Sequence, residues 1–447
     1  MRCRICCLLI LLSVGLGQNW ETGPILPGRP ATVSIATDTL CLPHVAFGGG
    51  RRLGYTSWNG TGWDVEYPDT NCSSGVSHVG LCLDTNDVPH AAYVLAGWPE
   101  PSELRYAFRD GDTWRIDTVA GGASPGRLAL GALALARDGT PHIVFVDSVT
   151  VEYAREVGDT WSILTVPAYQ ADSLRRLGGA SLTLDTNDQP GVAVTWTKYG
   201  TDDSLWLSFF EYDGQDWHRF DVDSAQGWGP WDFWPVCVRS DPATDLFHVV
   251  YRSGAYATGK DSSWQVEGAN VSVGNVCCDF VLNNGRPHIA CASMWDPVTY
   301  QWRWAGGWEG EMVVTKNADV VSVAVDRTGR PHIAFASAVD ETLFYARRLS
   351  VGEEEPPTTA QPEARLLVYP NPAARAFTVE FSAPRRTAAA ITLSGASGRT
   401  VWSRKENVGP GCYHRKISLP ASIGPGVYFC TLDRGGERIS RKVVLTD

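Results

Sequence analysis

Short runs of alternating apolar and polar residues recur along most of the chain, and each run ends in a tight polar turn. Leu81–Asp84 and Ser322–Asp326 show the alternation, and the turns Thr85–Asp87 and Arg327–Gly329 follow them. Alternation with a period of two predicts half-buried β-strands. Asp, Asn and Gly suit the backbone angles of hairpin turns. The pattern therefore predicts a long series of antiparallel hairpins.

The second strand of each hairpin begins with a repeated phrase, which reads Pro-His-Val-Ala-Phe at residues 43–47. The copies stand 40 to 57 residues apart, and in the copy at residues 190–194 Gly191 replaces the histidine. A period of this size indicates a repeat architecture with one supersecondary unit per copy. Six copies keep the histidine, as His44, His90, His142, His248, His288 and His332.

Two further strands complete each repeat. The third carries an aromatic-Ala pair such as Tyr106-Ala107, and a Trp such as Trp114 opens the fourth. Four antiparallel strands in each of seven repeats predict an all-β, seven-bladed β-propeller. The seventh repeat stops after its third strand at Arg347, whereas residues 19–25 resemble a fourth strand. We therefore expect an N-terminal strand with Trp20 to close the ring, which removes exposed sheet edges.

The remaining segments predict targeting and a second domain. Residues 1–17 join a basic start to an apolar run too short to span a bilayer, as in a signal peptide. The propeller then occupies residues 18–349, and an acidic, Pro-rich linker follows at 350–363. Short strands and Gly/Pro turns in residues 364–447 predict a small Ig-like β-sandwich. We expect no transmembrane segment in the mature chain.

Charge and cysteine usage narrow the partners. The chain has a net charge of −11, although residues 364–447 hold 13 Lys and Arg against 5 Asp and Glu. The main body is thus strongly acidic, which disfavours nucleic acid as a partner. Beyond the signal peptide nine cysteines remain, an odd number that leaves at least one unpaired within the chain. Cys412 and Cys430 are the pair that we expect to form a disulfide.

The repeats resemble the sialidase-like and lectin-like bacterial propellers over roughly residues 19–349. The turns at residues 110–114 and 213–217 look like shortened forms of the Asp-box turns of that family, without the leading Ser-x-Asp. The resemblance implies the fold only. A sialidase requires an arginine triad and an acidic acid/base, but the Phe-Arg-Ile-Pro phrase of that family is missing, and Arg51 and Arg52 are a weak substitute. No paired carboxylates have a defensible spacing.

Residues 366–447 resemble the type A C-terminal sorting domain of the type IX secretion system. The resemblance rests on Val-Tyr-Pro-Asn-Pro at 368–372, Gly-Val-Tyr at 426–428 and Arg-Lys-Val-Val-Leu at 441–445. It implies that the secretion machinery recognises residues 364–447 and carries the protein through the periplasm to the cell surface or the medium. Cys412 and Cys430 depart from the family pattern.

Two repeated features could bind metal, but each has a simpler structural explanation. The six histidines lie on separate blades, whereas a metal ion needs its ligating nitrogens within about 2 Å. We therefore expect buried, hydrogen-bonded scaffold residues. The identical turns Asp84–Asp87 and Asp185–Asp188 lack the length and the distal Glu of a calcium loop. Ordinary Asx turns account for them, and we predict neither a metal site nor a cofactor.

Tryptophan is the most informative residue for binding, since the chain has 18. We interpret these tryptophans either as a sugar-binding platform or as apolar plugs between blades. The first hypothesis is a non-catalytic module that binds a glycan or a protein. The alternatives are a glycan-active enzyme and a structural surface protein without a small ligand. The candidate ligand-binding residues, which cluster at 228–234 or follow second strands, are Trp228, Trp231, Trp234, Trp98, Trp196 and Trp295.

Overall fold

The fold was analysed in a computed structural model. It describes residues 19–72, 74–96, 101–123, 128–147, 150–168, 175–198, 204–226, 236–251, 255–268, 277–293, 296–304, 307–337, 339–349, 366–369, 373, 376–383, 387–395, 399–408, 411–420, 422–434 and 437–446. The chain divides into two compact units, with the boundary along the chain between residues 349 and 350. The described residues form strands and turns and contain no helix. They therefore include no helix that could span a membrane.

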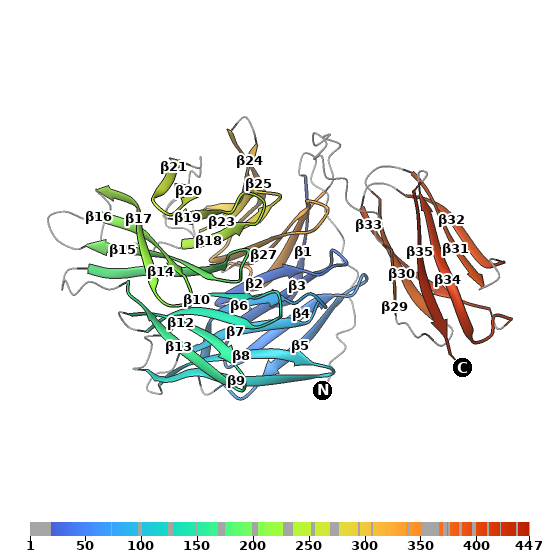
Figure 1. Ribbon diagram of the computed structural model, residues 1–447, viewed down its shortest axis with the longest axis horizontal. Helices are drawn as coiled ribbons and strands as arrows, with labels where there is room; N and C mark the ends of the chain where they lie inside the picture. The colour runs from blue at the N-terminus through green and yellow to red at the C-terminus, as the bar shows by residue number, and fades with distance from the viewer. Residues whose placement is uncertain are drawn as a thin grey trace. The chain divides into compact units, whose positions relative to one another are not determined.

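The described residues of the first unit form seven four-stranded antiparallel sheets (Figure 1). The first five comprise β2 (Thr32–Thr37) to β5, β6 to β9, β10 to β13, β14 to β17 and β18 to β21, and the sixth comprises β22 to β25. The seventh has the order β1-β28-β27-β26. The other strands are β1 (Trp20–Pro27), β3 (Pro43–Gly49), β4 (Arg52–Trp58), β5 (Trp63–Asp69), β6 (Gly75–Leu83), β7 (Pro89–Ala96), β8 (Ser102–Asp110), β9 (Thr113–Ala123), β10 (Leu128–Leu135), β11 (Pro141–Asp147), β12 (Thr150–Val157), β13 (Thr160–Val166), β14 (Arg175–Leu184), β15 (Pro190–Lys198), β16 (Ser204–Tyr212), β17 (Trp217–Gln226), β18 (Val236–Asp241), β19 (Leu246–Tyr251), β20 (Ala255–Lys260), β21 (Ser263–Gly268), β22 (Cys277–Asn283), β23 (Arg286–Ala292), β24 (Pro297–Trp304), β25 (Gly307–Asn317), β26 (Val320–Val325), β27 (Pro331–Ser337) and β28 (Thr342–Arg348).

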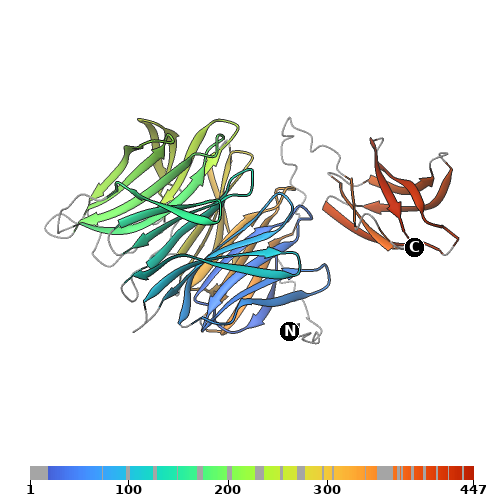
Figure 2. The same cartoon turned by 60° about the horizontal axis from the view of Figure 1, so that its bottom comes forward.

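Strand β1 completes the last sheet, as the sequence predicts. It pairs antiparallel with β28, with Trp20 opposite Arg348 and Gly23 opposite Tyr345. Figures 1 and 2 show the blue N-terminal strands beside the orange strands of the seventh sheet. The first strand of each sheet also contacts the first strands of the sheets before and after it, and β26 contacts both β22 and β2. The contacts between the sheets thus return to their starting point.

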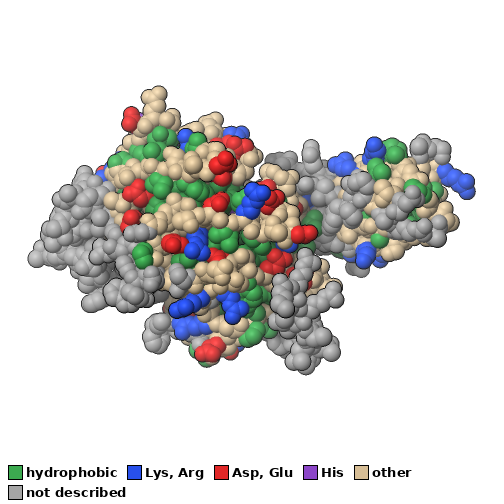
Figure 3. Space-filling model, turned by 90° about the horizontal axis from the view of Figure 1, so that it is seen from below, with side chains coloured by type: hydrophobic (Ala, Val, Ile, Leu, Met, Phe, Trp, Pro, Cys, Tyr) green, Lys and Arg blue, Asp and Glu red, His purple; other side chains and the backbone are tan. Residues whose placement is uncertain are grey.

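The core of the first unit lies between successive sheets. Each hydrophobic cluster combines buried side chains of two neighbouring sheets, such as Tyr93 with Tyr55, or Val250 with Phe280. Hydrogen bonds also connect the first strands of neighbouring sheets. For example, Ser34 Oγ accepts a hydrogen bond from the Leu81 N–H of the next sheet. On the surface drawn in Figure 3, acidic, basic and apolar side chains of this unit are interspersed. Faces of adjacent sheets, and not one central core, therefore bury the apolar area.

The second unit has two antiparallel sheets, with the orders β29-β30-β33 and β32-β31-β34-β35. Both sheets contribute to a single cluster of buried residues that includes Phe377, Phe381 and Ile391. Cys430 is fully buried in this cluster and carries a free thiol, so the structure does not contain the predicted bond to Cys412. The two cysteines lie on different sheets, in β33 and β34. The strands are β29 (Leu366–Tyr369), β30 (Ala376–Ala383), β31 (Thr387–Gly395), β32 (Thr400–Val408), β33 (Gly411–Ser418), β34 (Gly426–Arg434) and β35 (Glu437–Leu445).

Candidate functional site

The repeated histidines all make the same contact. In each case Nδ1 forms a hydrogen bond with the hydroxyl of the tyrosine on the next strand of the same sheet. The bond between His142 and Tyr153 measures 2.6 Å, and that between His332 and Tyr345 also measures 2.6 Å. The full set of pairs is His44–Tyr55, His90–Tyr106, His142–Tyr153, His248–Tyr256, His288–Tyr300 and His332–Tyr345.

Most of these histidines belong to the interior of the first unit. Five of them are buried, and burial lowers the pKa of His142 and of His288 to about 4. The second ring nitrogen of His332 lies 3.1 Å from Asp326, whereas that of His90 is buried without a partner in the described residues. Within the same residues, no group of His, Cys, Asp and Glu is placed to hold a metal ion. The arrangement is one that supports the sheets.

A tryptophan from the neighbouring sheet packs on each of these tyrosines. All six contacts are edge-to-face, with ring centroids 5.1–5.6 Å apart and interplanar angles of 66–82°. Each tryptophan is the one that opens the fourth strand, and Trp20 plays this part against Tyr300. Such pairs add stability beyond the area they bury. The pairs are Tyr55–Trp114, Tyr106–Trp161, Tyr153–Trp217, Tyr256–Trp308, Tyr300–Trp20 and Tyr345–Trp63.

The fourth sheet departs from this scheme at two positions together. Gly191 replaces the histidine, and Phe209 stands where the other sheets have tyrosine, still against a tryptophan, Trp264. A Cβ atom on Gly191 would lie 2.6 Å from Cζ of Phe209, so the phenyl ring fills the space of the missing imidazole. A histidine without the hydroxyl would be buried and unpaired. The paired change therefore keeps the interior satisfied.

The aspartate turns are Asx turns, as the sequence predicts. Asp84 Oδ1 accepts hydrogen bonds from the N–H groups of Asn86 and Val88, each at 2.8 Å. Asp185 does the same with Asn187 and Gln189. The fourth turn residues, Asp87 and Asp188, have φ angles of 62° and 59°. These turns use their carboxylates to fix the backbone.

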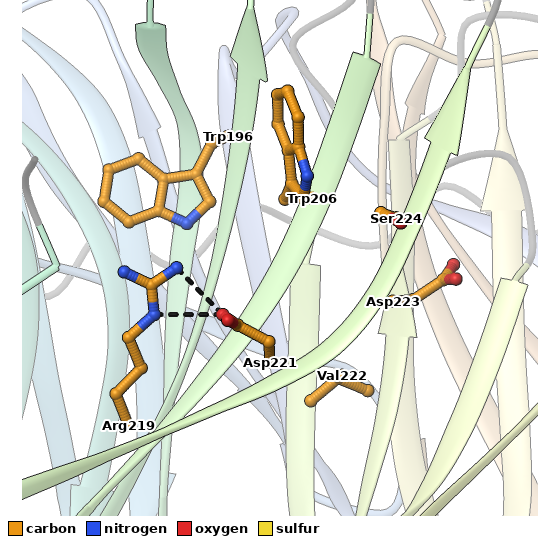
Figure 4. A pocket seen from close by; sticks show the side chains of 7 residues that line it. All are labelled: Trp196, Trp206, Arg219, Asp221, Val222, Asp223 and Ser224. Carbon is orange, nitrogen blue, oxygen red and sulfur yellow. Dashed lines mark hydrogen bonds and ion pairs between the residues drawn. The ribbon is translucent and has the colours of Figure 1, made fainter. Parts of the chain in front are cut away.

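A hollow on the fourth sheet is the candidate binding site. It has a volume of about 750 Å³ and lies against β15, β16 and β17. Trp196 and Trp206 face each other across β15 and β16 as direct partners. The register shift at Val222 in β17 changes the pairing there. The lining residues are Trp196, Trp206, Arg219, Asp221, Val222, Asp223 and Ser224 (Figure 4).

The other sheets can be aligned with the fourth by their cross-strand register, and those that reach this position do not have a tryptophan pair there. The Trp196–Trp206 position is Leu95–Glu103 in the second sheet, Asp147–Thr150 in the third and Ser337–Thr342 in the seventh. A repeat keeps its scaffold residues from copy to copy. This tryptophan pair is therefore additional to the scaffold.

The ring of Trp196 lines the hollow, whereas its nitrogen is buried. Its side chain is 4% exposed, and its indole nitrogen has no hydrogen-bond partner among the described residues. In Figure 4 the nitrogen-bearing edge of this ring faces the Arg219–Asp221 pair. A buried N–H without a partner costs roughly 1–3 kcal/mol.

Asp221 presents a fixed but accessible carboxylate. Its Oδ1 accepts hydrogen bonds from Ser208 Oγ at 3.0 Å and from Arg219 Nε and Nη2 at 3.0 and 2.8 Å, yet 75% of the side chain is exposed. Asp223 accepts a 2.5 Å hydrogen bond from the hydroxyl of Tyr251, and its carboxylate points away from Asp221 (Figure 4). The hollow thus combines two aromatic rings with oriented hydrogen-bonding groups.

Of the six tryptophans that the sequence singles out, the structure places Trp196 in this hollow. Trp98, Trp228, Trp231, Trp234 and Trp295 lie outside the described residues. Trp206 was missed, as were the polar residues of β17. Only the cross-strand register brings Trp206 opposite Trp196, and the spacing of the repeated phrase does not give that register.

The chain is similar to several solved structures at low sequence identity. The solved structures that resemble the chain include the α-L-arabinanase of Penicillium chrysogenum, at 10% identity and a TM-score of 0.45, covering 73% of this chain and 97% of that one. They also include the lectin of Aleuria aurantia, at 12% identity and a TM-score of 0.42, where the alignment covers 59% of this chain and 88% of the lectin. A Hadza microbial sialidase aligns at 13% identity and a TM-score of 0.39, and the alignment covers 72% of this chain and 66% of the sialidase. No curated protein matches the chain.

The C-terminal unit can be placed in a family. Residues 367–446 match the model of the secretion system C-terminal sorting domain. The match covers the strands from β29 to β35 except for the first residue of β29. The chain is therefore an all-β protein whose C-terminal part belongs to the type IX sorting domains, which direct export to the cell surface or into the medium.

Proposed function

We propose that the protein is an exported seven-bladed β-propeller, followed by a small Ig-like sorting domain, and that it binds a glycan in the hollow of the fourth sheet. The observation that carries the proposal is the Trp196–Trp206 pair above the Arg219–Asp221 ion pair, a set of side chains that the aligned repeats do not share. The seven-bladed assignment is supported by the seven sheets and the closed cycle of contacts between their first strands.

The chemistry of the lining suits a ligand with many hydroxyl groups. A sugar hydroxyl can donate a hydrogen bond to the exposed carboxylate of Asp221. The half-buried Trp206 ring offers an apolar surface to the C–H face of a pyranose. The volume of about 750 Å³ lies within the range of small-molecule sites. These features favour a glycan over a protein ligand.

The test is a glycan array with the full-length protein, followed by titration of the best glycan. We expect Trp206→Ala and Asp221→Asn each to weaken binding at least roughly tenfold, which corresponds to about 1.4 kcal/mol. Asp117→Asn is the matched control, because Asp117 is an exposed aspartate on the fourth strand of the second sheet. Retention of full affinity in both hollow variants would contradict the proposal.

One observation favours a second candidate, a glycan-active enzyme. Two carboxylates, Asp221 and Asp223, line the same hollow, and most glycosidases act through a pair of carboxylates. The same glycans should therefore be incubated with the protein and their reducing ends measured. Release of product that Asp223→Asn abolishes would support the enzyme. Binding without release of product would support the binding module.

A further inference from the structure

Two cysteines lie face to face inside the sixth sheet. Cys278 on β22 and Cys291 on β23 are direct cross-strand partners, and their sulfur atoms are 2.8 Å apart. Both carry free thiols in the structure. The two side chains are 7% and 0% exposed, and they pack against Val250 and Tyr256 of the fifth sheet.

The backbone geometry allows a covalent bond between them. Partners in an antiparallel pair have Cα atoms about 4.5–5.5 Å apart, within the range that disulfides span. A displacement of less than about 1 Å brings the sulfur atoms from 2.8 Å to bonding distance. The other thiol nearby, Cys237, contacts the backbone oxygen of Cys278 at 3.8 Å. The geometry therefore selects Cys291 as the partner of Cys278.

We propose that Cys278 and Cys291 form a cross-strand disulfide in the exported protein. The sorting domain directs the chain out of the cell, where disulfides persist. In the reaction the two thiols together lose two protons and two electrons, and a sulfur–sulfur bond forms between them. The electrons reduce an exchangeable disulfide, of a thiol oxidase or of a small disulfide such as oxidised glutathione, to two thiols.

The bond has to form before the fifth and sixth sheets pack together. Thiol–disulfide exchange requires a thiolate. In the folded protein, the hydrogen bond with Cys291 and then burial raise the pKa of the Cys278 thiol well above its ordinary value. The native dithiol therefore stays protonated and shielded from oxidants, whereas the unfolded chain can react. Whether Cys278 and Cys291 form a disulfide or remain two thiols therefore depends on whether the protein folded under oxidising conditions.

The test compares two routes of oxidation of the full-length protein. In the first, the chain is unfolded with a reductant and refolded with glutathione disulfide. In the second, the folded, reduced protein receives the same reagent. We expect only the first route to protect two cysteines from alkylation and to lower the intact mass by two hydrogens. Proteolysis after Phe280 should leave the two halves joined until a reductant is added.

Single substitutions identify the partners. Cys278→Ser and Cys291→Ser should each abolish the protected pair, whereas Cys237→Ser and Cys277→Ser should keep it. The oxidised wild type should melt roughly 5 °C higher than the reduced form, because a link across 13 residues restricts the unfolded chain. The proposal would be overturned if Cys278 and Cys291 could still be alkylated after oxidative refolding. A disulfide between either of them and Cys237 would overturn it as well. The proteolysis of the wild type decides the matter even if a variant fails to fold.

Discussion

The His142–Tyr153 pair allows the repeated scaffold to be tested by a double-mutant cycle. Their 2.6 Å hydrogen bond is buried, with 5% of His142 and 1% of Tyr153 exposed. Tyr153→Phe leaves Nδ1 of His142 without a partner, and His142→Ala leaves the tyrosine hydroxyl without one. An orphaned buried polar group costs about 1–3 kcal/mol, so each variant should lose at least this much stability. The alanine variant also loses packing.

The double variant should lose less than the sum of the two single variants. Once both partners are gone, neither leaves an unsatisfied group, and we expect a coupling energy of about 1–2 kcal/mol. The fourth sheet already contains such a combination, with Gly191 and Phe209 in place of the pair. Trp217 still has an aromatic ring to pack against in Tyr153→Phe.

The assay is equilibrium unfolding in guanidinium chloride, followed by tryptophan fluorescence. Phe209→Tyr is the matched control, because it adds a hydroxyl where Gly191 offers no imidazole. That variant should be destabilised by a similar 1–3 kcal/mol. Losses that add within about 0.5 kcal/mol, or a neutral Tyr153→Phe, would refute the view that the pair acts as a unit.

Three further predictions concern pH, ring closure and export. The pKa of His142 and of His288 is about 4 in the folded protein and about 6.5 when unfolded, so the unfolded state takes up protons first. Stability should be complete above pH 6.5 and fall as the pH decreases toward 4, by up to roughly 3 kcal/mol for each histidine, as unfolding curves across this range would reveal. Trp20→Ala should cost about 3–5 kcal/mol and expose β1 to proteases, because Trp20 is 5% exposed, packs on Tyr300 and donates to Glu311; limited proteolysis checks this. Deletion of residues 364–447 should leave a folded propeller in the periplasm, and its normal appearance in the medium would argue against the role of the sorting domain.

The sequence predicts the repeated parts well because the repeat is a local signal. The strand that starts at Trp20 could be assigned to the seventh sheet since that repeat lacks a fourth strand. The hollow could not be predicted, because Trp206 faces Trp196 only through the register of β15 and β16. The Cys278–Cys291 contact depends on register in the same way. The sequence also could not show that Cys412 and Cys430 lie in strands of different sheets.

The pairing of β1 with β28 has a consequence for how the chain acquires its structure. Glu21 and Arg347 meet in a 2.6 Å ion pair although 326 positions separate them along the chain. Contacts between such distant residues form late, since a very long loop must first be closed. A ribosome or a translocation pore releases residue 21 long before residue 347. The opening strand must therefore wait unpaired, and until the last repeat emerges both edges of the growing assembly remain open to strands of other molecules.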